Sequence, residues 1–301
     1  MKKLYTPCSI FEISYTSNYV RNYQEAIEYL KEINGIQSNI PVSSIGKSRG
    51  YPGNHEPLDI FAVDLFATEK SKRTIFIVGG FHRGEEGSSE SVLSLLENIV
   101  NSSDNPNLRK IRKDTHIFLV PQINSDYYAS FKDGNPNTFT SDLYNDDINS
   151  FPLTHVFDFM AQENSKRFPE LPKELFDESD LYGKISPEAM CLVNAIDSRI
   201  QQYGRPVIAV NFHETPVNGT GSTVQNYKYN TQQFVYYEIK KYFKITAKNT
   251  RSNLIMPTFD TLLKSKVARF SVTTETDSKA ALEERVKINL MIVERLMHEI
   301  L

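Results

Sequence analysis

The chain has 301 residues, of which 40% are hydrophobic and 24% are charged, and its net charge is -3 at pH 7. This composition is typical of a globular protein with a large buried core. It excludes the positive field on which binding to nucleic acid or to an anionic membrane depends, so we expect neither as a partner. No segment approaches the roughly 18 consecutive apolar residues of a membrane span.

Helical spacing of apolar residues alternates along the chain with short segments rich in β-branched and aromatic residues, which indicate strands. Helices are predicted over residues 21–34, 88–100, 186–203, 231–243 and 279–301. Strands are predicted over residues 58–66, 74–80, 115–121, 206–212 and 268–275. Either Ser88 or Ser89 is expected to cap the second helix, because a hydroxyl oxygen can accept a hydrogen bond from a free amide there.

This order of elements predicts an α/β fold, with a mixed, mostly parallel sheet and helices on both faces. Residues 122–186 are polar and irregular, and a connection of this length inside a compact chain usually serves function. Because no change in composition marks a linker, we expect residues 1–301 to form a single domain.

The cysteines and the N-terminal segment indicate a compartment. Cys8 and Cys191 are the only two cysteines, and they form no CxxC pair. Free thiols in a reducing compartment are the simplest interpretation. The segment after Lys2 and Lys3 has no continuous apolar region, which makes it a poor signal peptide. We therefore expect a cytoplasmic protein, in which histidine and carboxylate groups would hold any metal.

Polar residues that can bind a metal or transfer a proton stand at the ends of four of the predicted strands. They are His82 and Glu85, Asn124 and Asp126, His213 and Glu214, and Glu275 and Asp277. Taken singly, each has an ordinary explanation, since a His-x-x-Glu loop often arises by chance and Glu275 could cap the next helix. Ligands of open α/β sheets, however, bind beyond the carboxyl ends of the strands, where these residues are expected to meet.

Two histidines and one carboxylate, His82, Glu85 and His213, match the ligand set of a catalytic zinc, which leaves a fourth position for water. Glu275 is then the remaining carboxylate that can act as general base toward that water. The sequence therefore predicts one zinc ion at His82, Glu85 and His213, with Glu275 as the catalytic residue. His116 lies inside a predicted strand, and we expect it to be structural.

These residues lie in segments that resemble, in the same order, motifs of the zinc carboxypeptidase family. This family includes digestive carboxypeptidases, bacterial murein-peptide amidases and, more distantly, aspartoacylase and succinylglutamate desuccinylase. The segments are IGKSRGYP (45–52) for the Gly-x-Ser-x-x-Gly motif, GGFHRGEEG (79–87) for the His-x-x-Glu zinc motif, VPQINSDYY (120–128) for the Asn-Pro-Asp-Gly turn, VNFHET (210–215) for the third-ligand strand, and SVTTET (271–276) for the Thr-x-Glu strand of the general base. The resemblance implies a zinc carboxypeptidase-like fold.

The resemblance is incomplete where the family binds the terminal carboxylate of its substrate. The family's Asn-Arg pair corresponds to Asn149 and Ser150, so a hydroxyl replaces the arginine. No arginine occurs from residue 114 to 166, where the family carries the one that polarises the scissile carbonyl. A hydroxyl supplies neither the charge nor the forked donors of arginine. The cations that could substitute are Lys132, Arg83, Arg251 and Lys279.

The resemblance implies a zinc metallopeptidase that hydrolyses an amide bond in a small peptide, with murein peptides as one candidate. Glu275 would deprotonate the attacking water and then protonate the leaving amine. An alternative is an N-acyl amino acid deacylase, similar to desuccinylases and aspartoacylases, with an acyl-amino-acid substrate. An interpretation of another class is a non-catalytic relative that binds zinc or a ligand, which the missing arginine would favour.

Overall fold

The computed structural model describes residues 9–15, 19–36, 40–50, 56–82, 84–129, 131–132, 135–136, 187–215, 223–226 and 270–301. The elements in these ranges are α1 (Tyr23–Ile36), β1 (Val42–Lys47), β2 (Asp59–Leu65), β3 (Arg73–Val78), α2 (Glu86–Asn101), α3 (Pro106–Ile111), β4 (Thr115–Val120), α4 (Ser125–Ala129), β5 (Phe131–Lys132), β6 (Asn135–Pro136), α6 (Pro187–Tyr203), β7 (Arg205–Thr215), β8 (Thr223–Asn226), β9 (Phe270–Asp277) and α9 (Leu282–His298). Within the described residues, no helix is long and apolar enough to cross a membrane.

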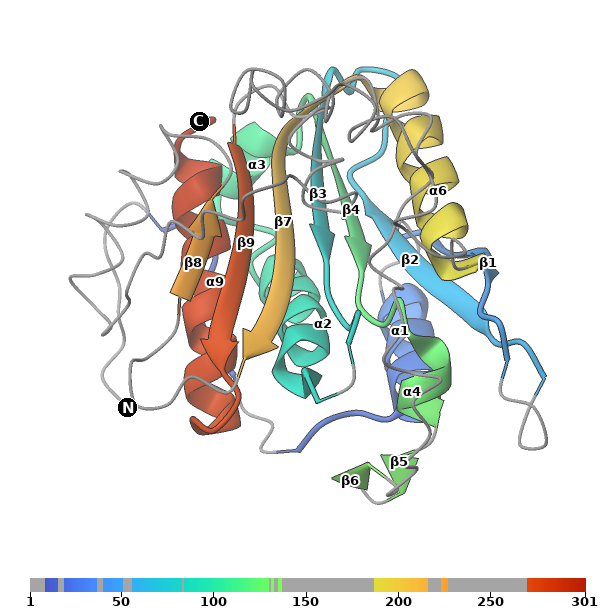
Figure 1. Ribbon diagram of the computed structural model, residues 1–301. Helices are drawn as coiled ribbons and strands as arrows, with labels where there is room; N and C mark the ends of the chain where they lie inside the picture. The colour runs from blue at the N-terminus through green and yellow to red at the C-terminus, as the bar shows by residue number, and fades with distance from the viewer. Residues whose placement is uncertain are drawn as a thin grey trace, which may run out of the picture.

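Seven of the described strands form one sheet in the order β1-β2-β4-β3-β7-β9-β8. The central strands β4, β3, β7 and β9 are parallel to one another, and their arrowheads in Figure 1 point toward the same edge. β2 runs antiparallel to β1 and to β4, and β8 runs antiparallel to β9. The prediction of a mixed, mostly parallel sheet is therefore confirmed.

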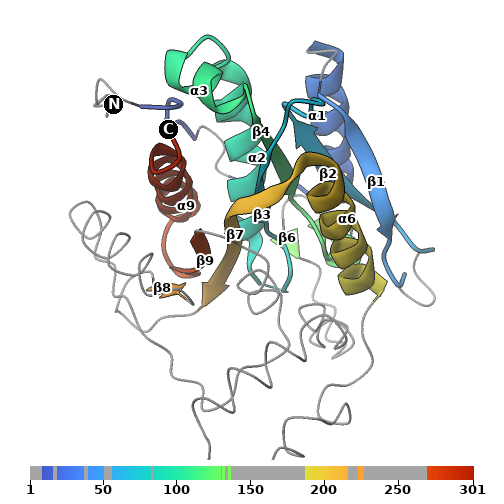
Figure 2. The same cartoon turned by 90° about the horizontal axis from the view of Figure 1, so that it is seen from above.

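Helices cover both faces of this sheet, as predicted. α1, α2 and α9 lie on one face and α6 lies on the other (Figure 2). In β3, Ile75 and Ile77 pack in the core beneath α2 and α9, while Phe76 and Val78 pack in the core beneath α6. Because both faces of β3 are buried, the last four residues of its sequence RTIFIV are a continuous apolar run without alternation.

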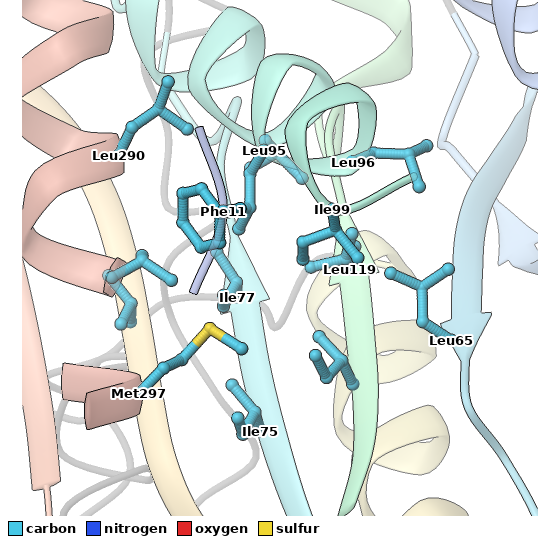
Figure 3. Close-up of a cluster of buried hydrophobic side chains, with 14 of the residues drawn as sticks. Phe11, Leu65, Ile75, Ile77, Leu95, Leu96, Ile99, Leu119, Leu290 and Met297 are labelled. Atoms are coloured by element: carbon cyan, nitrogen blue, oxygen red, sulfur yellow. The ribbon is translucent and has the colours of Figure 1, made fainter. Parts of the chain in front are cut away.

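The larger core lies between the sheet and the helices α2 and α9. Figure 3 shows Phe11, from the segment before α1, lying between Leu95 of α2 and Leu290 and Met297 of α9, near Ile77 of β3. All five side chains are buried. Burial of one such large side chain contributes about 1.5–3 kcal/mol, so the N-terminal segment is part of the core that fixes the two helices on the sheet.

The structure differs from the predicted elements at α2 and at the sheet edge. The prediction that Ser88 or Ser89 caps this helix is wrong, because α2 begins at Glu86 with Glu85 as its N-cap residue. The Ser88 hydroxyl instead donates a hydrogen bond to the Glu85 carbonyl oxygen. The edge strand β1 was not predicted, since its sequence VSSIGK is half-buried to exposed and shifts register before Gly46.

A buried ionic cluster joins β2, β4 and α6 toward the end of the sheet opposite to the carboxyl ends of β3 and β4. His116 Nε2 lies 2.8 Å from Asp64 Oδ1, and Arg199 Nη2 donates to Asp64 Oδ2 at 2.8 Å. Burial alone would raise the pKa of Asp64, but the hydrogen bonds from His116 and Arg199 outweigh burial and lower the pKa below its ordinary value. His116 is therefore a structural residue.

We expect Asp64→Asn to lower the free energy of unfolding by about 2–4 kcal/mol at pH 7, because Arg199 loses its counter-charge. The folded pKa of Asp64 is depressed, so its stabilisation is complete above the unfolded value of about 3.9 and is lost as pH falls through the folded value. Urea titrations should show the two proteins converging in that acidic window. Asp104→Asn, at an exposed aspartate, is the control. A difference between Asp64→Asn and wild type that stays constant into acid would contradict the interpretation.

Candidate metal centre

Two glycines after β3 turn the chain into the loop that carries His82 and Glu85. A Cβ on Gly79 would lie 2.4 Å from the Ser88 carbonyl oxygen, and Gly80 has a φ of 70°, which residues with side chains rarely adopt. The Gly80 N–H donates to Ser88 Oγ at 2.9 Å. The loop therefore folds against the first turn of α2, and His82 and Glu85 lie at the carboxyl edge of the sheet.

Residues after β4 hold this loop from the other side. The Asn124 amide donates to the Phe81 carbonyl oxygen at 3.2 Å, and the Asn124 N–H donates to the Gly80 carbonyl oxygen at 2.9 Å. Asp126 accepts a hydrogen bond from Ser48 Oγ at 2.5 Å. The two polar residues that follow β4 thus stabilise the loops around the centre.

Tyr127 binds the side chain of Glu86, the glutamate next to Glu85. Its hydroxyl accepts a hydrogen bond from the Gly84 N–H at 3.0 Å and donates one to Glu86 Oε1 at 2.6 Å. Glu86 is therefore occupied by a hydrogen bond in the first turn of α2. Glu85 is the carboxylate of this loop that lies with the histidines.

His213 reaches the centre because β7 extends beyond β3. The last residue pair between these strands is Val78 with Asn211, and His213 lies two residues further along β7. Phe81 stacks on the imidazole, with 5.6 Å between ring centroids and 16° between ring planes. His213 is 3% exposed, so its ring is held between the sheet and the loop.

The donor atoms of three side chains converge at this point. His82 Nδ1 lies 3.0 Å from both Glu85 Oε1 and His213 Nδ1, and His213 Nδ1 lies 3.0 Å from Glu85 Oε2. Atoms with this spacing can share one zinc ion at bond lengths of about 2.0–2.2 Å. Glu85 Oε2 is buried with His213 Nδ1 as its polar neighbour, and a cation held between these donor atoms would stabilise it. The residues present therefore fit zinc.

The electrostatics of Glu85 also favour a cation site. Burial would raise the pKa of Glu85, but the attraction and hydrogen bond of His213, together with those of His82, outweigh burial and lower the pKa to about 2. The carboxylate is ionised at neutral pH as a result. An ionised carboxylate is the form that coordinates a metal, and the imidazolium protons that attract Glu85 would leave when a metal binds.

Asn211 is a polar neighbour of His213 that the sequence did not single out. Asn211 Nδ2 lies 2.5 Å from His213 Nε2, the ring nitrogen that faces away from the other donors. A metal on Nδ1 leaves the ring proton on Nε2, and turning the Asn211 amide by 180° brings its buried Oδ1 to that nitrogen, where it accepts the proton and fixes the orientation of the ring. The sequence signal that could have identified Asn211 was the alternation of side chains along a strand, since residues 211 and 213 lie on one face of β7.

Glu275 lies beside the donor set by strand register. It is the direct partner of His213 in the parallel pairing of β7 with β9. Partner residues of adjacent strands are about 4.8 Å apart and project from the same face of the sheet. Glu275 is half-buried. A carboxylate thus flanks the His82, Glu85 and His213 cluster on the side of β9.

Glu214 belongs to the opposite face of β7. Its pKa is raised to about 7 by burial, although the charge of Arg285 and the hydrogen bonds from Gly87 and Arg285 oppose the rise. The sequence marked Glu214 as a strand-end residue without assigning it a role. The structure places Glu214 on the side of β7 that faces α2 and α9, opposite to His213.

The predicted substrate-binding residues stay predictions. Asn149, Ser150, Arg83 and Arg251 lie outside the described residues. Lys132 is described only as part of the backbone of the short strand β5. The helix predicted over residues 231–243 also lies outside the described residues.

Two histidines and a carboxylate at the carboxyl edge of an α/β sheet are the arrangement of a zinc hydrolase with one open coordination position. The chain belongs to the zinc carboxypeptidase family, whose profile matches residues 27–281. It is accordingly a zinc metallopeptidase, with a His-Glu-His group that can hold one metal ion.

Solved structures with this fold include metallo-carboxypeptidases. A metallo-carboxypeptidase from Burkholderia cenocepacia superposes with a TM-score of 0.62 and 13% identity, covering 92% of this chain and 68% of that one. Bovine thrombin-activatable fibrinolysis inhibitor, solved with tick carboxypeptidase inhibitor, superposes with a TM-score of 0.63 and 13% identity, covering 94% and 98%. At such identities the likeness establishes the fold. No curated protein matches the sequence.

We expect Asn211→Ala to weaken zinc binding by about 10- to 100-fold, because the ring of His213 loses the partner that fixes its orientation. Competition with a chromogenic chelator measures the dissociation constant. The matched control is Asn98→Ala, since Asn98 is a buried asparagine of α2 that bonds to Ser14 and Ser94, remote from the histidines. Equal zinc affinities of the two variants would contradict a specific role for Asn211.

Proposed function

We propose that the chain is a single catalytic domain that hydrolyses an amide bond in a small peptide by a carboxypeptidase-type mechanism. His82, Glu85 and His213 hold one zinc ion, and Glu275 is the general base. Membership of the zinc carboxypeptidase family supports the reaction class. The observation that carries the assignment of roles is the pairing of Glu275 with His213 across β7 and β9, beside three converging donor atoms.

Zinc bound at this centre would supply a Lewis acid that makes water a stronger nucleophile and polarises the scissile carbonyl. Glu275 has a position from which it can take the proton of the attacking water. The same carboxyl group then returns the proton to the leaving amine nitrogen, so the proton balance of the hydrolysis closes on one side chain. Asn211 keeps His213 oriented during these steps.

The substrate assignment rests on the sequence. Ser150 replaces the arginine that grips a terminal carboxylate in family peptidases, while Asn149 is retained. We propose that Arg83, Lys132 or Arg251 supplies the missing positive charge, because a carboxylate-bearing substrate requires a cationic partner. Both a peptide and an acyl-amino acid bear such a carboxylate, so a cation at the site does not distinguish between them. Their relative rates of hydrolysis distinguish a peptidase from a deacylase.

We expect the zinc-loaded protein to hydrolyse short peptides, murein peptides among them, faster than N-succinyl and N-acetyl amino acids. Specificity constants measured by amine release on one panel test this expectation. Faster hydrolysis of the acyl-amino acids would favour the deacylase. Zinc binding without hydrolysis of any substrate would favour a non-catalytic relative.

We expect Glu275→Gln to lower kcat by about 10²- to 10⁴-fold while zinc content stays normal, because the amide cannot accept the proton of water. Zinc content by atomic emission and kcat on the best peptide of the panel are the measurements. His82→Ala is the paired variant, and it should lose zinc as well as activity. A fully active Glu275→Gln protein would show that another group is the base.

A further inference from the structure

Glu214 links the strand of His213 to three other elements. Its side chain has no exposed surface. Glu214 Oε2 accepts hydrogen bonds from the Gly87 N–H of α2 at 3.0 Å and from Arg285 Nη1 of α9 at 2.6 Å. Glu214 Oε1 accepts one from the Thr276 hydroxyl of β9 at 3.2 Å. One buried carboxylate therefore connects β7 with α2, α9 and β9.

The contacts of Glu214 fall next to the residues of the metal centre. Gly87 comes two residues after Glu85, and Glu214 itself comes directly after His213. Thr276, which also donates a hydrogen bond to Glu214, comes directly after Glu275, the proposed base. The Glu214 carboxylate thus hydrogen-bonds to Gly87, in the segment of Glu85, and to Thr276, in the segment of Glu275. Glu214 itself belongs to the segment of His213, on the opposite face of the sheet.

The present position of this carboxylate requires glycine at position 87. A Cβ at position 87 would lie 2.2 Å from Glu214 Oε1, so the carboxylate would have to move away from α2. The φ of Gly87 is not positive, so the backbone conformation does not require glycine there. The last glycine of GGFHRGEEG therefore permits the close approach of Glu214 to the N-terminal turn of α2.

Arg285 makes the buried carboxylate tenable. An ionised group without a partner is strongly disfavoured in a protein interior, and the guanidinium of Arg285 supplies both charge and a hydrogen bond. Replacing a buried ion pair by apolar residues is often neutral or favourable for stability, so stability alone is weak reason for such a pair. Its position beneath the metal centre suggests a different role.

We propose that Glu214 is a positioning residue of the metal centre, which holds the His82–Glu85 loop, the His213 segment of β7 and the Glu275 segment of β9 in one fixed arrangement. Its hydrogen bonds go to Gly87, Thr276 and Arg285, which are not among the three donor residues. The proposal rests on the proposed function, because it assumes that these segments form the zinc site.

Glu214→Gln tests the proposal, because it preserves the size of the side chain and replaces one of the two acceptor oxygens by an amide nitrogen, which cannot accept the hydrogen bonds from Gly87, Arg285 or Thr276. We expect zinc affinity, measured by chelator competition, to fall about 10- to 100-fold, in the range found for residues that support metal ligands. The visible spectrum of the cobalt(II)-substituted protein should also change, since it reports the geometry of the donors. A residue that contributed only to stability would alter neither readout.

Asp64→Asn is the matched control, since it also replaces a buried carboxylate by an amide beside an arginine, at 2.8 Å from Arg199. We expect it to lose stability while zinc affinity and the cobalt spectrum stay as in wild type. A loss of zinc affinity as large as that of Glu214→Gln would mean that the effect follows from general destabilisation, and would overturn the proposal.

Thr276→Val is the second variant and serves if circular dichroism shows that Glu214→Gln does not fold. It removes the hydroxyl that lies 3.2 Å from Glu214 Oε1 and 3.4 Å from the His213 carbonyl oxygen, without changing side-chain size, and we expect a several-fold loss of zinc affinity. Unchanged affinity and an unchanged cobalt spectrum in the folded variants would overturn the proposal alone, provided that wild type binds zinc. Absence of zinc binding by wild type would overturn the proposed function and this inference together.

Discussion

The parallel pairing of β3 with β7 and of β7 with β9 is the interaction on which the metal centre depends. It brings the carboxyl ends of the neighbouring strands β3, β7 and β9 to one edge of the sheet, although the residues there lie far apart in sequence. The register of these pairs also decides which residues lie next to one another, because Asn211 aligns with Val78 at the end of β3, and His213 aligns with Glu275. A slip of one residue would turn His213 to the other face, toward the helices.

The two faces of β7 therefore have different tasks. Asn211 and His213 project to the face where α6 packs farther along the sheet, and His213 belongs there to the group that can hold a metal ion. Phe212 belongs to the core beneath α2 and α9, and Glu214 meets Arg285 on that same side. The contacts on the side of α2 and α9 stabilise the position of the residues on the other face of β7. Hydrogen bonds from Arg285, Gly87 and Thr276 offset the cost of burying Glu214.

Sequence periodicity was sufficient for the elements whose burial is strong. The apolar runs of β3 and β4 predicted their strands, and the spacing in α6 and α9 predicted their helices, because these segments bury large apolar surfaces. The polar edge strand β1 and the start of α2 were missed. In both places the chain follows tertiary contacts, such as the bonds of Ser88 to the Gly80 loop, that no local pattern encodes.

The sequence by itself determined the residue types and their order, since His82 and Glu85 follow a recognisable strand, and His213 and Glu275 each lie near the end of one. That reasoning works because strand ends of an α/β sheet meet at one edge. The tertiary structure decided which polar neighbours of these residues matter. Asn211 and Glu214 flank the same histidine in sequence, but the alternation of a strand sends one amide to the imidazole and one carboxylate to the helices. Only the packing of α2 and α9 on β7 supplies the Gly87 amide and the Arg285 guanidinium that make a buried carboxylate stable there.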